Sequence, residues 1–252
     1  MGLWTFTHFY AIIPAFIAFA GIAVLLGFIL KNKHNCATWI LRGIAIAIIV
    51  LEIFKQVISF IKGYDLYHIP FHYCSLFLYL LPMHAFANGK FKRYIDGITF
   101  ATTSSLFLFY MIIPTILYPE GAIINYFNDF FEFHTVTFHH LVVLYLFLAI
   151  AFRKFELKLT KDFSLIATIL SAYVIIATIL SYSLNVNFHN LKKCNFDALE
   201  NIRMALNSSL SWFGQAVYVA MLFVCTTLVG YIAYYLISLF YKHVAKGKSS
   251  IK

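Results

Sequence analysis

The stretch from Thr38 to Ile61, TWILRGIAIAIIVLEIFKQVISFI, decides the fold. It is longer than the ~20 mostly apolar residues that a helix needs to cross the hydrocarbon core of a bilayer. It also carries Glu52, Lys55 and Gln56, which are costly in lipid and tend to mark function. The stretch therefore predicts a membrane-spanning helix with a polar patch near one end.

Apolar runs of this kind fill the whole chain. Of its 252 residues 62% are hydrophobic and 12% are charged, whereas soluble domains have ~45–50% and ~25%. This composition excludes a large extramembrane domain. It predicts an all-α polytopic membrane protein, with residues 1–252 as one domain of about seven transmembrane helices. The other six expected spans are Phe9–Leu30, Pro70–Ala87, Gly97–Tyr118, His134–Phe152, Phe163–Leu184 and Gly214–Tyr241.

The charges indicate an orientation. The net charge is +9, but the basic residues lie in short loops between apolar runs, so they favour a topology signal over nucleic-acid binding. One side has Lys62, Lys192, Lys193 and Arg203. The other side has most of the basic residues: Lys31, Lys33, Lys90, Lys92, Arg93, Arg153, Lys154, Lys158, Lys161, Lys242, Lys246, Lys248 and Lys252. Because cytoplasmic loops carry the excess, we expect the N-terminus outside and the C-terminus inside a cell membrane, with the bacterial cytoplasmic membrane favoured.

The longest loop, residues 185–213, falls on the outer side. Asp197 and Glu200 have capping-box spacing, and apolar residues recur at helical intervals from Leu199 to Leu210. We expect an amphipathic helix that lies at the outer interface.

Polar residues inside the spans gather at the outer side. Glu52, Lys55, Gln56 and Ser59 have i, i+3, i+4 and i+7 spacing, which places them on one helix face. The third and fifth spans both begin at the outer side with polar residues, namely His68, Pro70, His72, Cys74 and Ser75, and then His134, Thr135, Thr137, His139 and His140. Three helix ends at one depth predict a shared site around His72, Cys74, His139 and His140, with His68 and His134 as ordinary interfacial residues.

Other interpretations of these residues stay open. Glu52 and Lys55 could form an ion pair that only fixes helix packing. Cys74 and Cys194 share the outer side and could form a disulfide. A zinc site from Glu52, His72, His139 and His140 has suitable residue types but no known ligand spacing, so we expect no metal and no cofactor.

Two short motifs resemble a known family. Pro70-Phe71-His72-Tyr73-Cys74 and His139-His140-Leu141-Val142-Val143 are similar to YwaF-type bacterial integral membrane proteins and their eukaryotic relative, transmembrane protein 164. The likeness continues through residues 186–190, VNFHN, to Cys194 and covers most of the chain. In the eukaryotic relative the cysteine directly precedes the motif histidine, where this chain has Phe71. Here Cys74 stands two residues after the histidine, as in bacterial members, and on a helix it would lie on nearly the same face as position 71, about one turn away.

The resemblance implies an integral membrane acyltransferase that moves a fatty acyl chain between phospholipids and lysophospholipids through a cysteine thioester. It assigns Cys74 as nucleophile and His140 as the histidine of the fifth span, with His139 as the alternative and His72 as the motif histidine. The partners it implies are membrane phospholipids, not nucleic acid; the oligomeric state is not addressed.

Residues outside the motifs complete this hypothesis. Asn187 and Asn190 could donate amides to an oxyanion, although loop asparagines more often form turns. Substrate binding is expected to involve Glu52, Lys55, Gln56, Lys192 and Arg203. The rival hypothesis is a small-solute or ion transporter that uses the buried Glu, Lys and His residues. A transport path needs polar residues in the inner half, where we expect only hydroxyls bonded to their own helix, at residues 102–105, Thr226 and Thr227.

Overall fold

The computed structural model describes residues 4–117, 119–194 and 196–246, which are mainly helical and contain no strand. Tyr118, the expected end of the fourth span, lies outside these residues, as do Lys248 and Lys252 of the basic tail. Six described helices are long and apolar enough to cross a membrane. They are α1 (Phe6–Ile29), α2 (His34–Ile61), α4 (Gly89–Ile112), α7 (Phe130–Ala151), α8 (Leu159–Ser183) and α10 (Trp212–Lys246). The prediction of an all-α polytopic membrane protein is confirmed.

The third expected span is shorter than predicted. Its helix α3 covers only Leu76–Phe86, preceded by the 3₁₀ turns η1 (Leu66–His68) and η2 (Tyr73–Ser75). Pro70 disfavours helical geometry at the residue before it, and Ile69 is extended with ψ 129°. The predicted full-length span from Pro70 is therefore wrong. His72 and Cys74 instead lie on irregular backbone, which at membrane depth is tolerated only where protein or a polar cavity surrounds it.

The fourth expected span is displaced along the chain. Helix α4 begins at Gly89, before the expected Gly97, because the basic stretch after Gly89 is helical and Lys92 pairs with Asp96 one turn later. It ends at Ile112, and Pro114 then begins the separate short helix α5 (Pro114–Leu117), followed by α6 (Glu120–Ile124). A proline lacks the N–H that would continue the helix, which explains the break.

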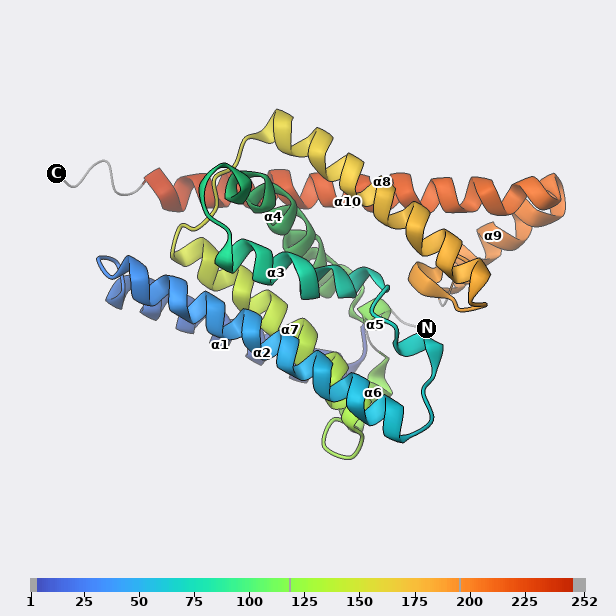
Figure 1. Ribbon diagram of the computed structural model, residues 1–252, viewed down its shortest axis with the longest axis horizontal. Helices are drawn as coiled ribbons and strands as arrows, with labels where there is room; N and C mark the ends of the chain where they lie inside the picture. Colours follow the sequence, from blue (N-terminus) through green and yellow to red (C-terminus); the bar gives the residue numbers. More distant parts are fainter. Residues whose placement is uncertain (1–3, 118, 195, 247–252) are drawn as a thin grey trace.

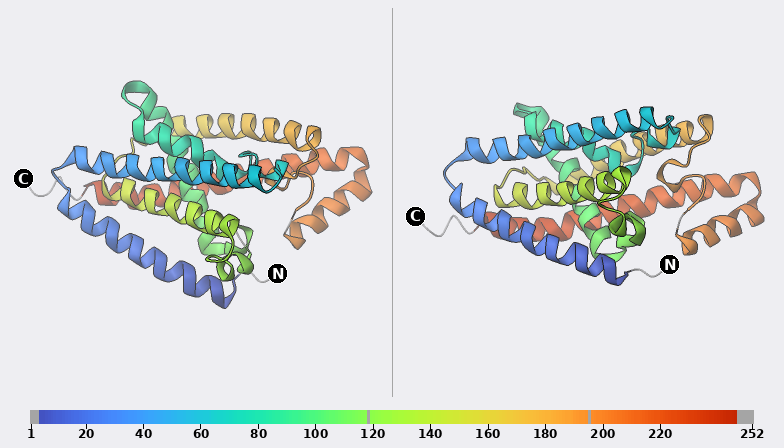
Figure 2. Two further views of the ribbon diagram at one scale, coloured as in Figure 1. Left: turned by 60° about the horizontal axis from the view of Figure 1, so that its bottom comes forward. Right: turned by 90° about the horizontal axis from the view of Figure 1, so that it is seen from below.

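Most of the long helices run lengthwise between two ends of the molecule, and α4 crosses them obliquely (Figure 1). At one end lie the α1–α2, α3–α4 and α7–α8 connections and the end of α10; at the other lie the α2–α3 and α8–α9 connections and the start of α1 (Figures 1 and 2). The first end receives the described basic residues from Lys31 to Lys161 that the sequence tally grouped together, and we call it the basic end. We call the other the site end. Their assignment to the two sides of a membrane stays a prediction.

The expected loop helix is present as α9 (Asp197–Leu210). Its N-cap is Phe196 and has no side-chain capping hydrogen bond, so the predicted capping box does not form. Glu200 instead accepts a hydrogen bond from the backbone N–H of Cys194 at 2.8 Å. The helix is held to the preceding loop by this carboxylate, and its location at a membrane interface stays a prediction.

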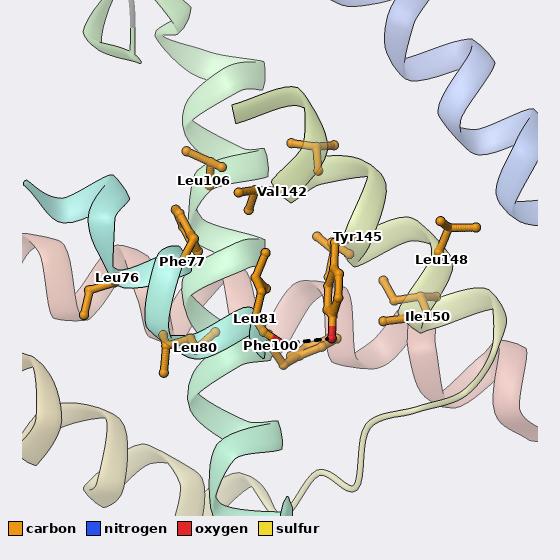
Figure 3. Packing of buried hydrophobic residues seen from close by; sticks show 14 of the residues in the cluster. Leu76, Phe77, Leu80, Leu81, Phe100, Leu106, Val142, Tyr145, Leu148 and Ile150 are labelled. Atoms are coloured by element: carbon orange, nitrogen blue, oxygen red, sulfur yellow. Dashed lines mark hydrogen bonds between the residues drawn. The ribbon is translucent and has the colours of Figure 1, made fainter. Parts of the chain in front are cut away.

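An apolar layer crosses the middle of the bundle. Figure 3 shows Phe77, Leu80 and Leu81 of α3 beside Leu106 of α4 and Val142 of α7. These side chains are at most 4% exposed. The layer lies between Cys74, at the start of α3, and His84, near its end, so it divides the polar residues of the site end from those of the basic end.

Gly97 of α4 allows a close helix contact and provides a stability test. A Cβ atom there would lie 2.6 Å from Cγ of Asp162, whose carboxylate is held by Arg93 and Tyr234. We expect Gly97→Ala to destabilise the protein by roughly 1–3 kcal/mol because the contact has no room to relax. Thermal unfolding in detergent measures this.

Gly43 of α2 is the matched control, because a Cβ there would meet nothing within 4 Å. Gly43→Ala should leave stability unchanged or raise it by about 0.5–1 kcal/mol through the helix preference of alanine. Equal effects of the two substitutions would contradict the close contact at Gly97.

Candidate functional site

Glu52 is the centre of a buried polar network on α2. Its carboxylate accepts hydrogen bonds from Lys55 Nζ at 3.0 Å and Gln56 Nε2 at 2.7 Å. The predicted common face is confirmed by these contacts, and Ser59, one turn further along, is 2% exposed. The polar face of α2 thus points into the bundle at the site end.

His134 of α7 also belongs to this network, although it was expected to be an ordinary interfacial residue. Its Nε2 lies 3.0 Å from Oε2 of Glu52, and the ring is buried. The contact joins α2 to α7 and makes His134 a structural partner of Glu52, not an ordinary interfacial histidine. Nothing in the sequence could pair the two, because α3, α4, α5 and α6 all lie between their helices along the chain.

Gln56 fastens the irregular segment between α2 and α3. Its Nε2 also donates to the backbone carbonyl of His68 at 2.7 Å, and its Oε1 accepts from the hydroxyl of Tyr64 at 2.9 Å. The ring of His68 stacks on Phe131 with centroids 4.5 Å apart. These contacts fix the segment that leads to His72 and Cys74.

Cys74 and His72 share two tyrosine neighbours. Nε2 of His72 donates a hydrogen bond to the backbone carbonyl of Tyr67 at 3.0 Å. The hydroxyl of Tyr173, on α8, donates to the backbone carbonyl of His72 at 2.8 Å. The phenol groups of both tyrosines lie within electrostatic range of the Cys74 thiol, as do Lys55 and Glu52. Because a carbonyl only accepts, Nε2 of His72 carries the proton and Nδ1 is left to act as a base.

The two histidines of the fifth span face different ways. His139 and His140 each donate from Nδ1 to the backbone carbonyl four residues earlier, at 2.8 Å. The ring of His140 then packs against Phe16 and Phe19 of α1 and against Tyr110 of α4. His139 instead has Lys55 and His134 among its electrostatic neighbours. The structure thus groups His139 with the Glu52 network and places His140 towards α1.

His189 is a further candidate from the loop between α8 and α9. It belongs to η3 (Phe188–Asn190) and has the left-handed φ of 54°, which costs energy for a residue other than glycine. The centroid of its ring lies 5.8 Å from that of Tyr73, the residue before Cys74, and 5.0 Å from that of Tyr173. Burial lowers the pKa of His189 to about 3, with a smaller effect of nearby His72, so the imidazole is neutral at pH 7.

A small cavity borders His189. It has a volume of about 30 Å³ and is lined by Tyr73, Tyr173 and Thr227 as well as His189. Two of its buried polar atoms, Nε2 of His189 and Oγ1 of Thr227, have no hydrogen-bond partner in the described part of the protein. A volume of this size matches about one water molecule or one hydroxyl group. The sequence motif around His189 pointed to this loop but not to this role.

The remaining expected binding residues are engaged in local contacts. Asn187 donates from its side-chain amide to the carbonyl of Lys193 at 2.7 Å and accepts from the backbone N–H of Lys192 at 3.0 Å, so it forms a turn. Arg203 holds Glu200 through two hydrogen bonds of 2.8 and 2.6 Å. Lys192 bonds Asn185. Asn190 has φ 58° and offers its backbone carbonyl to Tyr218.

The four cysteines form no disulfide bond. Cys36, Cys74, Cys194 and Cys225 are all free thiols, so the alternative disulfide between Cys74 and Cys194 does not form. Within the described residues, no group of three or more His, Cys, Asp or Glu side chains is arranged to hold a metal ion.

The basic end contains a second polar network. The expectation was that this half of the protein would contain only hydroxyl groups bonded to their own helix. Buried His84 of α3 lies 2.6 Å from the Tyr145 hydroxyl and 3.3 Å from Asp96. Buried Asp162 pairs with Arg93 at 2.7 Å and accepts from Tyr234 at 2.7 Å. The expectation was wrong because Asp96 and Asp162 lie within α4 and α8, just before the points at which the expected spans began.

The hydroxyl groups of α4 and α10 were expected to bond to their own helix, and this is confirmed for some of them. Thr102, Thr103 and Ser105 donate to carbonyls of their own helix at 2.8, 2.6 and 2.8 Å. Ser104 and Thr227, in contrast, have buried hydroxyls without a partner among the described residues. The apolar layer of Figure 3 separates the two networks on α3 and α7, which does not favour a continuous polar path.

The helices and their polar residues define the class: a multi-pass helical membrane protein with Cys, His and Glu side chains gathered at one end. A family model, the TMEM164 family, matches residues 3–237. The chain belongs to the TMEM164 family. The comparisons with curated proteins and with solved structures gave no match.

Proposed function

We propose that the protein is a membrane acyltransferase that moves a fatty acyl chain from a phospholipid to a lysophospholipid through a thioester on Cys74. The observation that carries the proposal is the placement of Cys74 in the turn η2, two residues after His72, with Tyr67 and Tyr173 bonded to His72 and within electrostatic range of the Cys74 thiol. A thiol becomes a nucleophile when a neighbouring base takes its proton.

The first step is acylation of Cys74. Nδ1 of His72 takes the thiol proton, and the sulfur attacks the ester carbonyl carbon of the donor lipid. The ester C–O bond breaks, the lysophospholipid oxygen takes the proton back from His72, and the acyl group remains as a thioester. The Lys55 ammonium, paired with Glu52 at 3.0 Å, is an electrostatic neighbour of the sulfur and favours the thiolate, whereas burial and the Glu52 carboxylate oppose it, so a base beside the thiol is needed.

The second step transfers the acyl group from Cys74 to the acceptor. A lysophospholipid hydroxyl in the cavity beside His189 gives its proton to Nε2 of His189, and its oxygen attacks the thioester carbonyl carbon. The C–S bond breaks and the thiolate recovers the proton from His189. A neutral imidazole is required for this role, in agreement with the lowered pKa of His189.

The transporter hypothesis receives less support. A transport path needs polar residues that continue from one end of the molecule to the other. Phe77, Leu80 and Leu81 interrupt such a path between Cys74 and His84 on α3 (Figure 3). A polar cluster confined to one end, with an apolar layer beyond it, suits a lipid-modifying enzyme better.

The proposal is tested by acyl exchange with purified protein in vesicles. The donor is a phosphatidylcholine with a deuterated acyl chain and the acceptor is an unlabelled lysophospholipid. We expect label in the acceptor and, after rapid quenching, a hydroxylamine-sensitive acyl group on the peptide that contains Cys74. If solute flux is found instead, without any transfer of label, the acyltransferase proposal is wrong.

A further inference from the structure

A large apolar cavity lies at the basic end, away from the Cys74 site. It has a volume of about 780 Å³, within the range of roughly 300–1,000 Å³ that ligand pockets usually have. Its walls come from the last turns of α1 and α7 and from α10, and these helix ends lie next to one another in Figure 2. Neither the Cys74 site nor the Glu52 network lines it.

The walls of the cavity are apolar over a long stretch. On α1 the lining runs from Ala20 to Leu30, which is about 15 Å along a helix axis. Phe107 and Phe147 and the buried Leu146 line it from α4 and α7. An elongated apolar space of this length fits a hydrocarbon chain that lies along the bundle.

The rim of the cavity is basic. Lys31, His34, Arg153 and Lys154 line one end, and no Asp or Glu occurs among the described lining residues. Lys31 and His34 are exposed. Lys154 donates from Nζ to Thr38 at 2.8 Å and to the carbonyl of His34 at 3.3 Å, and so ties α7 to the start of α2. The positive charges are therefore held together at the mouth of an apolar space.

Two backbone features add to the positive potential at this mouth. Helix α2 begins there at His34, and its N-cap Lys33 makes no side-chain capping hydrogen bond, so the N–H groups of the first turn are available to an anion. Arg153 adopts φ 56° at the end of α7, a conformation that usually selects glycine. Arg153 nevertheless lines the rim in this strained conformation.

We propose that this cavity binds one anionic glycerophospholipid, with an acyl chain along α1 and α10 and the phosphate at the basic rim. Apolar walls with a uniformly positive mouth are complementary to such a lipid, and less so to a zwitterionic one. The lipid is distinct from the substrate of the Cys74 site, because the apolar layer of α3, α4 and α7 separates the two places. The inference does not depend on the proposed acyl transfer.

Lipid retention in nanodiscs tests the inference. The protein is reconstituted with equal amounts of phosphatidylglycerol and phosphatidylcholine of the same acyl composition, and lipids that stay bound are counted by native mass spectrometry. We expect phosphatidylglycerol to be retained at least tenfold over phosphatidylcholine. Replacing both Lys31→Gln and Arg153→Asn should lower its affinity roughly 30-fold, about fivefold per charge. Asparagine is chosen because it tolerates positive φ.

Controls separate the cavity from the general charge of the basic end. Lys90→Gln removes an exposed charge that does not line the cavity and should change nothing. Val24→Trp, at an exposed lining position, should remove retention of both lipids, whereas Leu25→Trp, exposed but outside the lining, should not. If the double variant does not fold, Lys31→Gln alone should still lower affinity about fivefold. Equal retention of both lipids, or a preference unaffected by Lys31→Gln, would overturn the proposal.

Discussion

Replacing Cys74 by serine is expected to lower the rate of acyl exchange at least roughly 10³-fold, because the weaker nucleophile has no base matched to its much higher pKa. The protein should still insert and fold, because serine is close to cysteine in size and the position is only partly buried. The measurement is transfer of the deuterated acyl chain in vesicles, with thermal unfolding as the check on folding.

Cys225→Ser is the matched control for the nucleophile. Cys225 is an exposed free thiol on α10 and takes no part in the site. The Cys225→Ser variant should exchange acyl chains at the rate of the unsubstituted protein. A lipid-like chloroacetamide should still label Cys74 in this variant. Full activity in Cys74→Ser would rule out the thioester and leave the His72 and Glu52 groups to be considered as a hydrolytic site.

The membrane fold could be read from the sequence because its signal is local. A run such as Thr38–Ile61 is mostly apolar over more than the length of a span, and most of the charge lies in the loops between such runs. The length of α3 could not be read in this way. Pro70, Phe71 and Tyr73 are as apolar as a helix interior, and only the contacts of Gln56 and Tyr173 with this segment show why the backbone stays irregular.

The site was predictable where its residues share one helix. The face of Glu52, Lys55 and Gln56 follows from helical spacing alone. The partnership of Glu52 with His134 depends on how α2 and α7 pack, and so does the turn of His140 towards α1. Periodicity says nothing about either. The network of His84 with Asp96 was missed for a related reason, since the fourth expected span began at Gly97 and so left Asp96 of α4 in a loop.

His189→Asn is expected to slow release of the acyl group from Cys74 by about 10²–10⁴-fold, the usual contribution of a general base. Asparagine keeps the tolerance for φ 54° that this position needs, so the loop should hold its shape. Because only the second step uses His189, the acyl group should accumulate on Cys74 as a hydroxylamine-sensitive adduct. Quenched-flow mass spectrometry of the Cys74 peptide measures this accumulation.

The accumulation distinguishes a base from a structural residue. If His189 only packed against Tyr73 and Tyr173, its loss would disturb both steps, and neither adduct nor product would form. Thr227→Val, which removes the other unpartnered polar atom of the cavity, should slow the second step less strongly and also favour the adduct, because the acceptor hydroxyl loses a contact but keeps its base. A His189→Asn protein that turns over normally, with no adduct, would exclude the cavity as the place where the acceptor is deprotonated.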